Sequence, residues 1–216
     1  MDIVFDMSNA CVLVVGASSG IGRAVAVMAA GSGARVWAVA RREELLMKMN
    51  SMNSNITPVK ADVENIEAFV KTLVSLTKQV KFTHLVYCVA ATNDTPPDMM
   101  FNVNCVIPVT ITKLLVRHGL RSAVYISSLA NVVPTGELWY DASKAALSHV
   151  VADVARELTP CRVNAVCPAR VVDDDDLRTT ALTVCTLLND DMHVTGVNWP
   201  LVYRPVAYNC DTDKWM

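Results

Sequence analysis

A short apolar run that leads through a glycine-rich loop into a helical pattern constrains the fold of this chain most. The run Cys11–Val15 reads CVLVV, and the loop after it, Gly16–Gly22, reads GASSGIG. In this context the first glycine permits a tight turn, Gly20 lets the backbone approach a pyrophosphate, and Gly22 lets the helix pack closely on the strand. The helix N-terminus then offers free N–H groups and a positive dipole end to phosphate. The loop therefore predicts a dinucleotide site, with a purely structural turn as the alternative.

Apolar β-type runs and helical patterns alternate along most of the remaining chain. Runs this apolar, separated by helices, indicate a parallel sheet that is covered on both faces. A length of 216 residues, without a repeat or a linker, suits one domain. The sequence therefore predicts an α/β fold, with a single doubly wound Rossmann-type domain over residues 1–216. The expected strands after the first lie at 35–40, within 56–63, and at 84–90, 122–128 and 161–168.

Charge and cysteine usage limit the partners and the compartment. The formal net charge is −2, which gives no whole-molecule attraction to nucleic acid or to an anionic membrane. The first ten residues include acidic but no basic side chains, and we find no apolar run near the ~20 residues of a membrane span. The seven cysteines form no CxxC pair, which is typical of free thiols in a reducing compartment. We therefore expect a cytoplasmic protein without nucleic-acid, membrane or metal partners.

The end of the second expected strand indicates which dinucleotide binds. Ala40 is followed by Arg41 and Arg42, whereas an NAD enzyme usually places an acid about 20 residues past the loop, against the ribose 2′-OH. Guanidinium groups can instead bind a 2′-phosphate through charge-assisted hydrogen bonds. The sequence therefore predicts NADPH/NADP+ as the cofactor, and replacement of Arg41 is expected to remove the preference. The alternative is a solvated helix start.

A tyrosine and a lysine four residues apart form the candidate catalytic pair. Tyr140 and Lys144 stand in the stretch YDASK, at the start of the helical pattern expected at 141–158. Residues four apart share one helix face, so the two side chains are expected to lie side by side. An ammonium beside a phenol lowers the pKa of the phenol, which suits it to proton transfer near neutral pH.

Taken together, these motifs resemble the short-chain dehydrogenase/reductase family. GASSGIG, YISS, YDASK and RVNAVCP follow one another in the family's order between Cys11 and Pro168. The resemblance implies that Tyr140 donates a proton to the substrate oxygen, and that Lys144 tunes it and holds the nicotinamide ribose. It also implies that Asn104 anchors a water-linked proton relay to the lysine.

The resemblance further assigns a serine of YISS to the substrate carbonyl. Motif alignment selects Ser128. The segment from there to Tyr140 is slightly shorter than usual, so Ser127 stays open as the alternative.

Cofactor contacts are implied at several points along the same motifs. Asp62 and Val63 match the pair that borders the adenine, and Asn164 and Pro168 match the segment beside the nicotinamide. The residues implied to bind the cofactor are Gly16, Ser18, Ser19, Gly20, Ile21, Arg41, Arg42, Asp62, Val63, Ala90, Tyr140, Lys144, Pro168 and Val171.

Three features depart from the family's pattern. Ala91 and Ala169 stand where the family has glycines, and Asp173 stands where a threonine often touches the carboxamide. The segment between Pro168 and Thr195 is much shorter than usual, which predicts a shortened substrate lobe. The substrate is therefore not inherited from the family.

The acidic run that begins at Asp173 has two interpretations. Carboxylates suit a helix N-terminus, so the run is expected to open a helix. A metal site is the alternative, which we disfavour because consecutive residues point in different directions.

We therefore expect an NADPH-dependent oxidoreductase that reduces a ketone or aldehyde, or oxidises the alcohol. The alternatives are a cofactor sensor or scaffold that has lost its chemistry, a reductase of C=N or pteridine-type rings, and an NAD-dependent dehydrogenase. Apolar faces around residues 104–115 and 141–158 match the family's dimer-forming helices, and they predict a homodimer or homotetramer.

Overall fold

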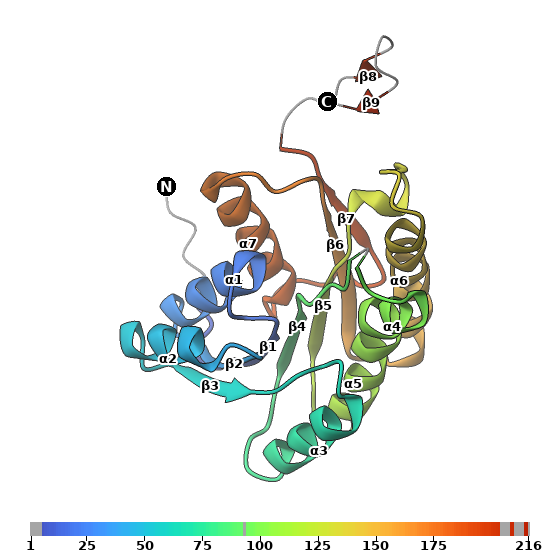
Figure 1. The fold of residues 1–216 in the computed structure, drawn as a ribbon. Coiled ribbons are helices and arrows are strands. Elements are labelled where there is room, and N and C mark those ends of the chain that lie inside the picture. The colour runs from blue at the N-terminus through green and yellow to red at the C-terminus, as the bar shows by residue number, and fades with distance from the viewer. Residues whose placement is uncertain (1–5, 93, 204–207, 210–213, 216) are drawn as a thin grey trace.

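The fold is a parallel sheet with helices on both faces (Figure 1). The computed structural model describes residues 6–92, 94–203, 208–209 and 214–215. Within them the main sheet has seven strands in the order β3-β2-β1-β4-β5-β6-β7, and all neighbours are parallel. The strands are β1 (Cys11–Val15), β2 (Arg35–Ala40), β3 (Ile56–Lys60), β4 (His84–Tyr87), β5 (Ser122–Ile126), β6 (Arg162–Pro168) and β7 (Asn198–Leu201), followed by the short antiparallel pair β8 (Tyr208–Asn209) and β9 (Lys214–Trp215).

The helices connect successive strands, as parallel pairing requires. They are α1 (Gly20–Gly31), α2 (Glu43–Met52), α3 (Ile66–Thr77), α4 (Pro97–Phe101), α5 (Ile107–Val116), α6 (Leu138–Glu157) and α7 (Asp174–Leu188). A π-helical turn, η1 (Asn102–Val106), joins α4 to α5, and a 3-10 turn, η2 (Leu129–Asn131), precedes α6.

Two apolar layers lie on opposite sides of the sheet because successive side chains of a strand point to opposite faces. Val12 and Val14 of β1 pack in the layer covered by α1, α2 and α7. Leu13 and Val15 pack in the layer covered by α3, α5 and α6. Burial on both faces explains why the strands are continuously apolar, and it confirms the predicted doubly wound α/β fold.

Two strands end earlier than the sequence predicts. β4 ends at Tyr87 and β5 at Ile126, whereas the expected strands continue to residues 90 and 128. On one side β4 pairs with β1. That strand ends at Val15, because Gly16 turns the chain away with a φ of +91°. Beyond Val15, the hydrogen-bonded ladder between β1 and β4 therefore stops. The segments after β4 and β5 are thereby free to form the carboxyl edge of the sheet.

Contrary to the expectation from the sequence, one helical stretch is long and apolar enough for a membrane span. Pro97–Val116, which comprises α4, η1 and α5, has 20 residues and a mean hydropathy of 1.6, enough to cross a membrane by length and composition. Its inner side, including Met100, Ile107 and Ile111, lies in the apolar layer between the sheet and the helices. A helix that covers a sheet in this way is apolar for that reason alone.

The acidic run at Asp173 begins a helix, as predicted. Asp173 is the N-cap of α7, and its Oδ1 accepts a hydrogen bond of 2.9 Å from the Asp176 N–H. Asp176 Oδ2 accepts one of 2.9 Å from the Val172 N–H, so this carboxylate caps the same turn. In the described part of the chain, no three His, Cys, Asp or Glu side chains are grouped to hold a metal ion.

The cysteines of the described residues are free thiols. Cys11, Cys161, Cys167 and Cys185 are buried. Cys210, the last cysteine in the sequence, lies outside the described residues.

Candidate active site

The glycine-rich loop has the geometry that its sequence predicts. Gly16 and Gly20 adopt positive φ angles of 91° and 54°. A Cβ at Gly22 would lie 2.2 Å from the Gly16 carbonyl oxygen, so only glycine allows α1 to pack this closely on the loop. A Cβ at Gly20 would meet no atom within 4 Å, which shows that this part of the loop faces open space.

The N-terminus of α1 is available to an anion. Its N-cap, Ser19, makes no side-chain capping bond, and the first turn contains no acidic residue. The free N–H groups and the positive end of the helix dipole therefore remain for a ligand. They border a pocket of about 480 Å³ at the carboxyl edge of β1, β2 and β4, where the strand order reverses. Ligands of open α/β sheets bind at such a switch point.

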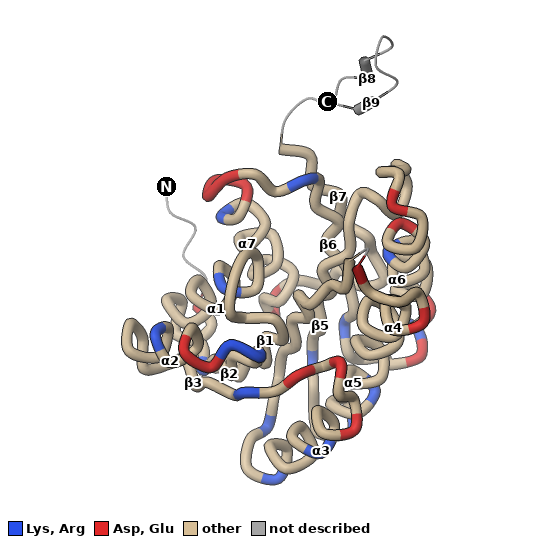
Figure 2. The backbone as a smooth tube through the Cα atoms, viewed as in Figure 1, with Lys and Arg blue, Asp and Glu red and all other residues tan. Residues whose placement is uncertain are grey.

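Eight of the residues that the sequence implies to bind the cofactor line this first pocket. Those expected are Gly16, Ser18, Ser19, Arg41, Arg42, Asp62, Val63 and Ala90. Cys88 and Glu64 line it as well, and no motif of the sequence indicates Glu64. Charges of both signs meet here, because a basic segment between β2 and α2 faces an acidic segment after β3 (Figure 2).

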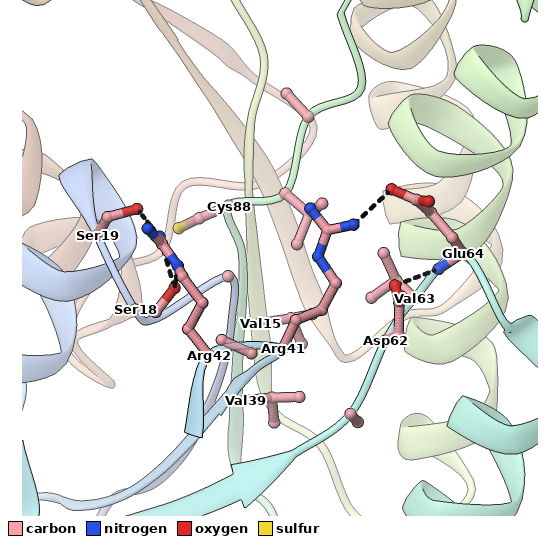
Figure 3. A pocket seen from close by; sticks show the side chains of 15 residues that line it. Val15, Ser18, Ser19, Val39, Arg41, Arg42, Asp62, Val63, Glu64 and Cys88 are labelled. Atoms are coloured by element: carbon pink, nitrogen blue, oxygen red, sulfur yellow. Dashed lines mark hydrogen bonds and ion pairs between the residues drawn. The ribbon is translucent and has the colours of Figure 1, made fainter. Parts of the chain in front are cut away.

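The two arginines of the pocket point in different directions (Figure 3). Arg42 reaches over the glycine-rich loop, where its Nη2 donates hydrogen bonds of 2.9 Å to Ser18 Oγ and 2.6 Å to Ser19 Oγ. Arg41 turns to the other side, and its Nη1 lies 3.1 Å from Glu64 Oε1 in an ion pair. The sequence places both guanidiniums at this end of the strand, but it does not reveal that only one of them lies over the loop.

A second pocket, of about 680 Å³, continues from the first at Cys88 and Ala90, which line both. It brings together the expected residues Ile21, Ala90, Ser128, Tyr140, Lys144, Pro168 and Val171. Thr135, Glu137 and Arg170 also line it. They stand in irregular segments, for which neither periodicity nor motif spacing provides a signal.

Lys144 lies deep in this pocket beneath Tyr140. The lysine side chain is buried, and its Nζ donates a hydrogen bond of 2.9 Å to the Ile126 carbonyl oxygen. The same Nζ lies 5.7 Å from the centre of the Tyr140 ring. Burial lowers the pKa of Lys144 from 10.5 to about 8, because the charged ammonium loses its hydration.

The expected effect of the lysine on the tyrosine is wrong for the protein alone. Burial raises the pKa of Tyr140 above its ordinary value, and a hydrogen bond with the Ser128 side chain opposes that rise. Lys144 directs its ammonium to a backbone carbonyl below the ring. Desolvation of the phenol therefore sets the direction of its pKa shift, opposite to the lowering that the sequence predicts.

The two serines of YISS have different surroundings. Ser127 is buried, and its Oγ donates to the Lys144 carbonyl oxygen at 3.2 Å and shares a hydrogen bond of 2.8 Å with Ser148 Oγ. Ser128 Oγ accepts a hydrogen bond from the Ala130 N–H at 3.1 Å, and the same side chain bonds the Tyr140 phenol. Only Ser128 is thus paired with the phenol.

Asn104 lies in the π-helical turn and binds the loop that follows β4. Its side chain accepts a hydrogen bond of 2.7 Å from the Ala91 N–H and donates to the Ala91 carbonyl oxygen at 3.0 Å. It also donates to Ser143 Oγ at 2.9 Å, and that hydroxyl donates to the Tyr140 carbonyl oxygen at 2.8 Å. Asn104 therefore links the cofactor side of the pocket to the helix of Tyr140 and Lys144.

Asn164 lies apart from both pockets. It is buried on β6, donates to the Val194 carbonyl oxygen at 2.9 Å and accepts from the Val197 N–H at 3.1 Å. These bonds fix the approach to β7. Among the described residues, the side chain of Asn164 therefore makes structural contacts.

The chain beside the second pocket is short between β6 and α7, and Pro168, Ala169, Arg170 and Val171 of this stretch line the pocket. Only residues 169–173 connect the end of β6 to the start of α7. This short connection agrees with the shortened substrate lobe that the sequence predicts.

Comparison with known proteins identifies the family of a chain with this fold and this pair of pockets. The family model described as short chain dehydrogenase matches residues 10–178. The L-xylulose reductase of Caenorhabditis elegans is 32% identical over 189 residues, which are 79% of this chain and 75% of that protein.

Solved structures agree on the fold. A dehydrogenase/reductase from Sinorhizobium meliloti 1021 has a TM-score of 0.78 at 21% identity, and the match covers 89% of this chain and 93% of that one. BdcA, solved in complex with NADPH, has a TM-score of 0.79 at 20% identity, with 89% and 92% covered.

The chain belongs to the short-chain dehydrogenase family. It is accordingly an oxidoreductase that uses a nicotinamide dinucleotide.

Proposed function

We propose that the protein reduces a ketone or aldehyde to the alcohol with NADPH, or catalyses the reverse reaction. The observation on which this depends is the continuity of the two pockets. Arg42 lies over the phosphate-binding loop at one end, and Ser128, Tyr140 and Lys144 line the other. A neighbour of the same fold was solved with NADPH, which is consistent with the proposal.

The residues of the second pocket divide the reaction between them. When bound, the nicotinamide supplies the hydride. Ser128 and Tyr140 hold the carbonyl oxygen by hydrogen bonds, and the phenol gives up its proton as negative charge develops there. Lys144 adds positive charge below the ring, which favours the phenolate once the proton has left.

A hydroxylated carbonyl compound is the substrate class that we favour. Thr135, Glu137 and Arg170 give the pocket polar and charged walls, which suit hydroxyl groups better than a hydrocarbon. The relative named L-xylulose reductase supports this class.

A substrate screen tests the proposed function. Oxidation of NADPH, followed by its absorbance, is measured with ketoses, dicarbonyls, aromatic ketones, cyclic imines and pteridines. We expect the highest kcat/KM for a hydroxylated ketone. Turnover of the imines or pteridines alone would refute carbonyl reduction. It would favour the alternative, a reductase of C=N or pteridine-type rings. Tight NADPH binding without turnover of any of them would favour the sensor.

Arg42 is expected to determine the cofactor preference. In the parent protein NADPH should bind at least about tenfold more tightly than NADH, or roughly 1.4 kcal/mol. Arg42→Ala should lose this difference, because its guanidinium lies over the loop, whereas Arg41 is paired with Glu64. This assignment moves the expected effect from Arg41, which the sequence alone favours, to its neighbour. Fluorescence titration with both cofactors provides the measurement.

Arg156→Ala is the matched control, since this exposed arginine of α6 lies outside both pockets. It should keep the parent's ratio of affinities. Equal affinities of the parent for NADPH and NADH would refute the cofactor assignment.

The two serines should respond differently to replacement by alanine. Ser128→Ala is expected to lower kcat by about 10²-fold, because it removes a donor at the developing oxyanion. Ser127→Ala should keep most of the turnover and lose about 1 kcal/mol of stability, because its buried hydroxyl bonds Ser148. Steady-state kinetics and urea unfolding of both variants check this. A larger loss of kcat in Ser127→Ala would reverse the assignment.

We also propose that the protein forms a homodimer or homotetramer through α5 and α6. Lys113 and Glu157 join these helices by an ion pair of 2.8 Å, so that they present one continuous surface. Packing of the same surface from two copies would bury its apolar positions, which include half-buried Val109 and Val150.

A further inference from the structure

An ion pair inside the first pocket occupies one of the two arginines that could bind a phosphate. Arg41 Nη1 and Glu64 Oε1 lie 3.1 Å apart, and their side chains are 65% and 42% exposed. Both residues line the pocket. Figure 3 shows Arg41 directed at Glu64, away from the serines that Arg42 contacts.

The position of Glu64 is fixed by the turn that precedes it. The Glu64 N–H donates a hydrogen bond of 3.0 Å to Asp62 Oδ1. This bond between residues two apart sets the direction of the backbone as it leaves β3. The Glu64 side chain is thereby kept beside the mouth of the pocket, opposite the two guanidiniums.

A carboxylate in this place acts against a phosphate in two ways. It occupies a guanidinium that could otherwise bind the phosphate, and its own negative charge repels a dianion. An exposed ion pair is weak, so a ligand can compete for Arg41 but must give up the pair to do so. A ligand with a 2′-hydroxyl instead of the phosphate meets neither penalty.

We infer that Glu64 is a specificity-determining residue of the cofactor site, which weakens binding of the 2′-phosphate by holding Arg41 in an ion pair. The inference rests on the proposed function, in that the phosphate is taken to bind at these arginines. Arg42 then supplies the affinity for NADPH, and the Arg41–Glu64 pair limits it.

The inference is tested with fragments that isolate this half of the cofactor. 2′,5′-ADP, which has the phosphate, and 5′-AMP, which lacks it, are titrated calorimetrically into the parent protein and Glu64→Gln. The variant should bind 2′,5′-ADP about fivefold more tightly, or about 1 kcal/mol, and 5′-AMP with unchanged affinity. Glu64→Ala, which also removes the neutral acceptor, should show a gain at least as large.

Glu67→Gln is the matched control. Glu67 forms an exposed ion pair with Lys71 at 2.6 Å, only three residues away in the sequence, but it does not line the pocket. Loss of this carboxylate should leave the affinities for both fragments as in the parent. An equal gain in Glu67→Gln would show that net charge alone is responsible, and it would overturn the inference.

The Arg41→Ala background determines whether Glu64 acts through its partner. In that background Glu64→Gln should strengthen 2′,5′-ADP binding much less, because only the direct repulsion by the carboxylate is then removed. Unchanged affinity of Glu64→Gln in the parent background, or a gain that is equally large without Arg41, would refute the inference. If the parent protein binds 2′,5′-ADP no better than 5′-AMP and Arg42→Ala changes neither, the proposed cofactor preference itself fails. The two failures are therefore distinguishable.

Discussion

Replacement of Tyr140 by phenylalanine is expected to lower turnover by about 10²–10⁴-fold and to leave the affinity for NADPH nearly unchanged. The phenol, which we propose as the proton donor, lies beside Ser128 in the second pocket, whereas the glycine-rich loop borders the first. Loss of the hydroxyl therefore removes proton transfer without altering the phosphate contacts. Steady-state kinetics with NADPH and fluorescence titration of the cofactor separate the two effects.

Tyr125→Phe is the control for the loss of a phenol hydroxyl elsewhere. Tyr125 is buried on β5 and shares a hydrogen bond of 2.7 Å with Thr112, away from both pockets. Its replacement should reduce stability slightly and keep turnover near that of the parent. If Tyr140→Phe kept more than about a tenth of the parent's turnover, a different group would have to be the acid.

Replacement of Lys144 by methionine should abolish measurable turnover and weaken NADPH binding, yet stabilise the protein without cofactor at neutral pH. The ammonium is buried, and the hydrogen bond recorded for its Nζ goes to the Ile126 carbonyl oxygen. An apolar side chain of similar length avoids the desolvation of this charge. A gain in stability together with a loss of function would identify the lysine as a residue retained for its chemistry.

The pH dependence of stability gives the sharper measurement. The pKa of Lys144 is about 8 in the folded protein and 10.5 in its ordinary state, so the unfolded chain binds more protons between these values. The free energy of unfolding of the parent should therefore rise with pH across this window, by an amount on the order of 3 kcal/mol, relative to Lys144→Met. Urea unfolding at several pH values measures it. A constant difference between the two proteins from pH 8 to 10.5 would contradict the assigned pKa.

The sheet could be predicted closely because burial on both faces makes its strands apolar throughout. The ranges of β1 and β2 agree with the expected ones to the residue, since each is bounded by a change in composition. The expected β4 extends three residues too far. Cys88, Val89 and Ala90 are as apolar as a strand, but they form a pocket wall. Composition cannot distinguish these two uses of apolar residues.

The candidate site was predictable where its geometry is local. Tyr140 and Lys144 lie on one face of α6 because they are four residues apart. The pairing of Arg41 with Glu64 joins residues 23 apart in the sequence, and neither motif nor periodicity encodes it. The elevated pKa of Tyr140 also depends on how several elements bury the ring. Partners and burial of this kind come only from the tertiary fold.

The hydrogen bonds of Asn104 have a mechanical consequence. They join both peptide groups of Ala91 to Ser143, which in turn binds the backbone of Tyr140. The segment after β4, whose Ala90 lines both pockets, and Tyr140, the proposed proton donor, therefore share one anchor point in the interior. Thermal motion of this anchor should therefore displace the segment after β4 and Tyr140 together. We expect the distance between the two to vary less than the position of each one alone.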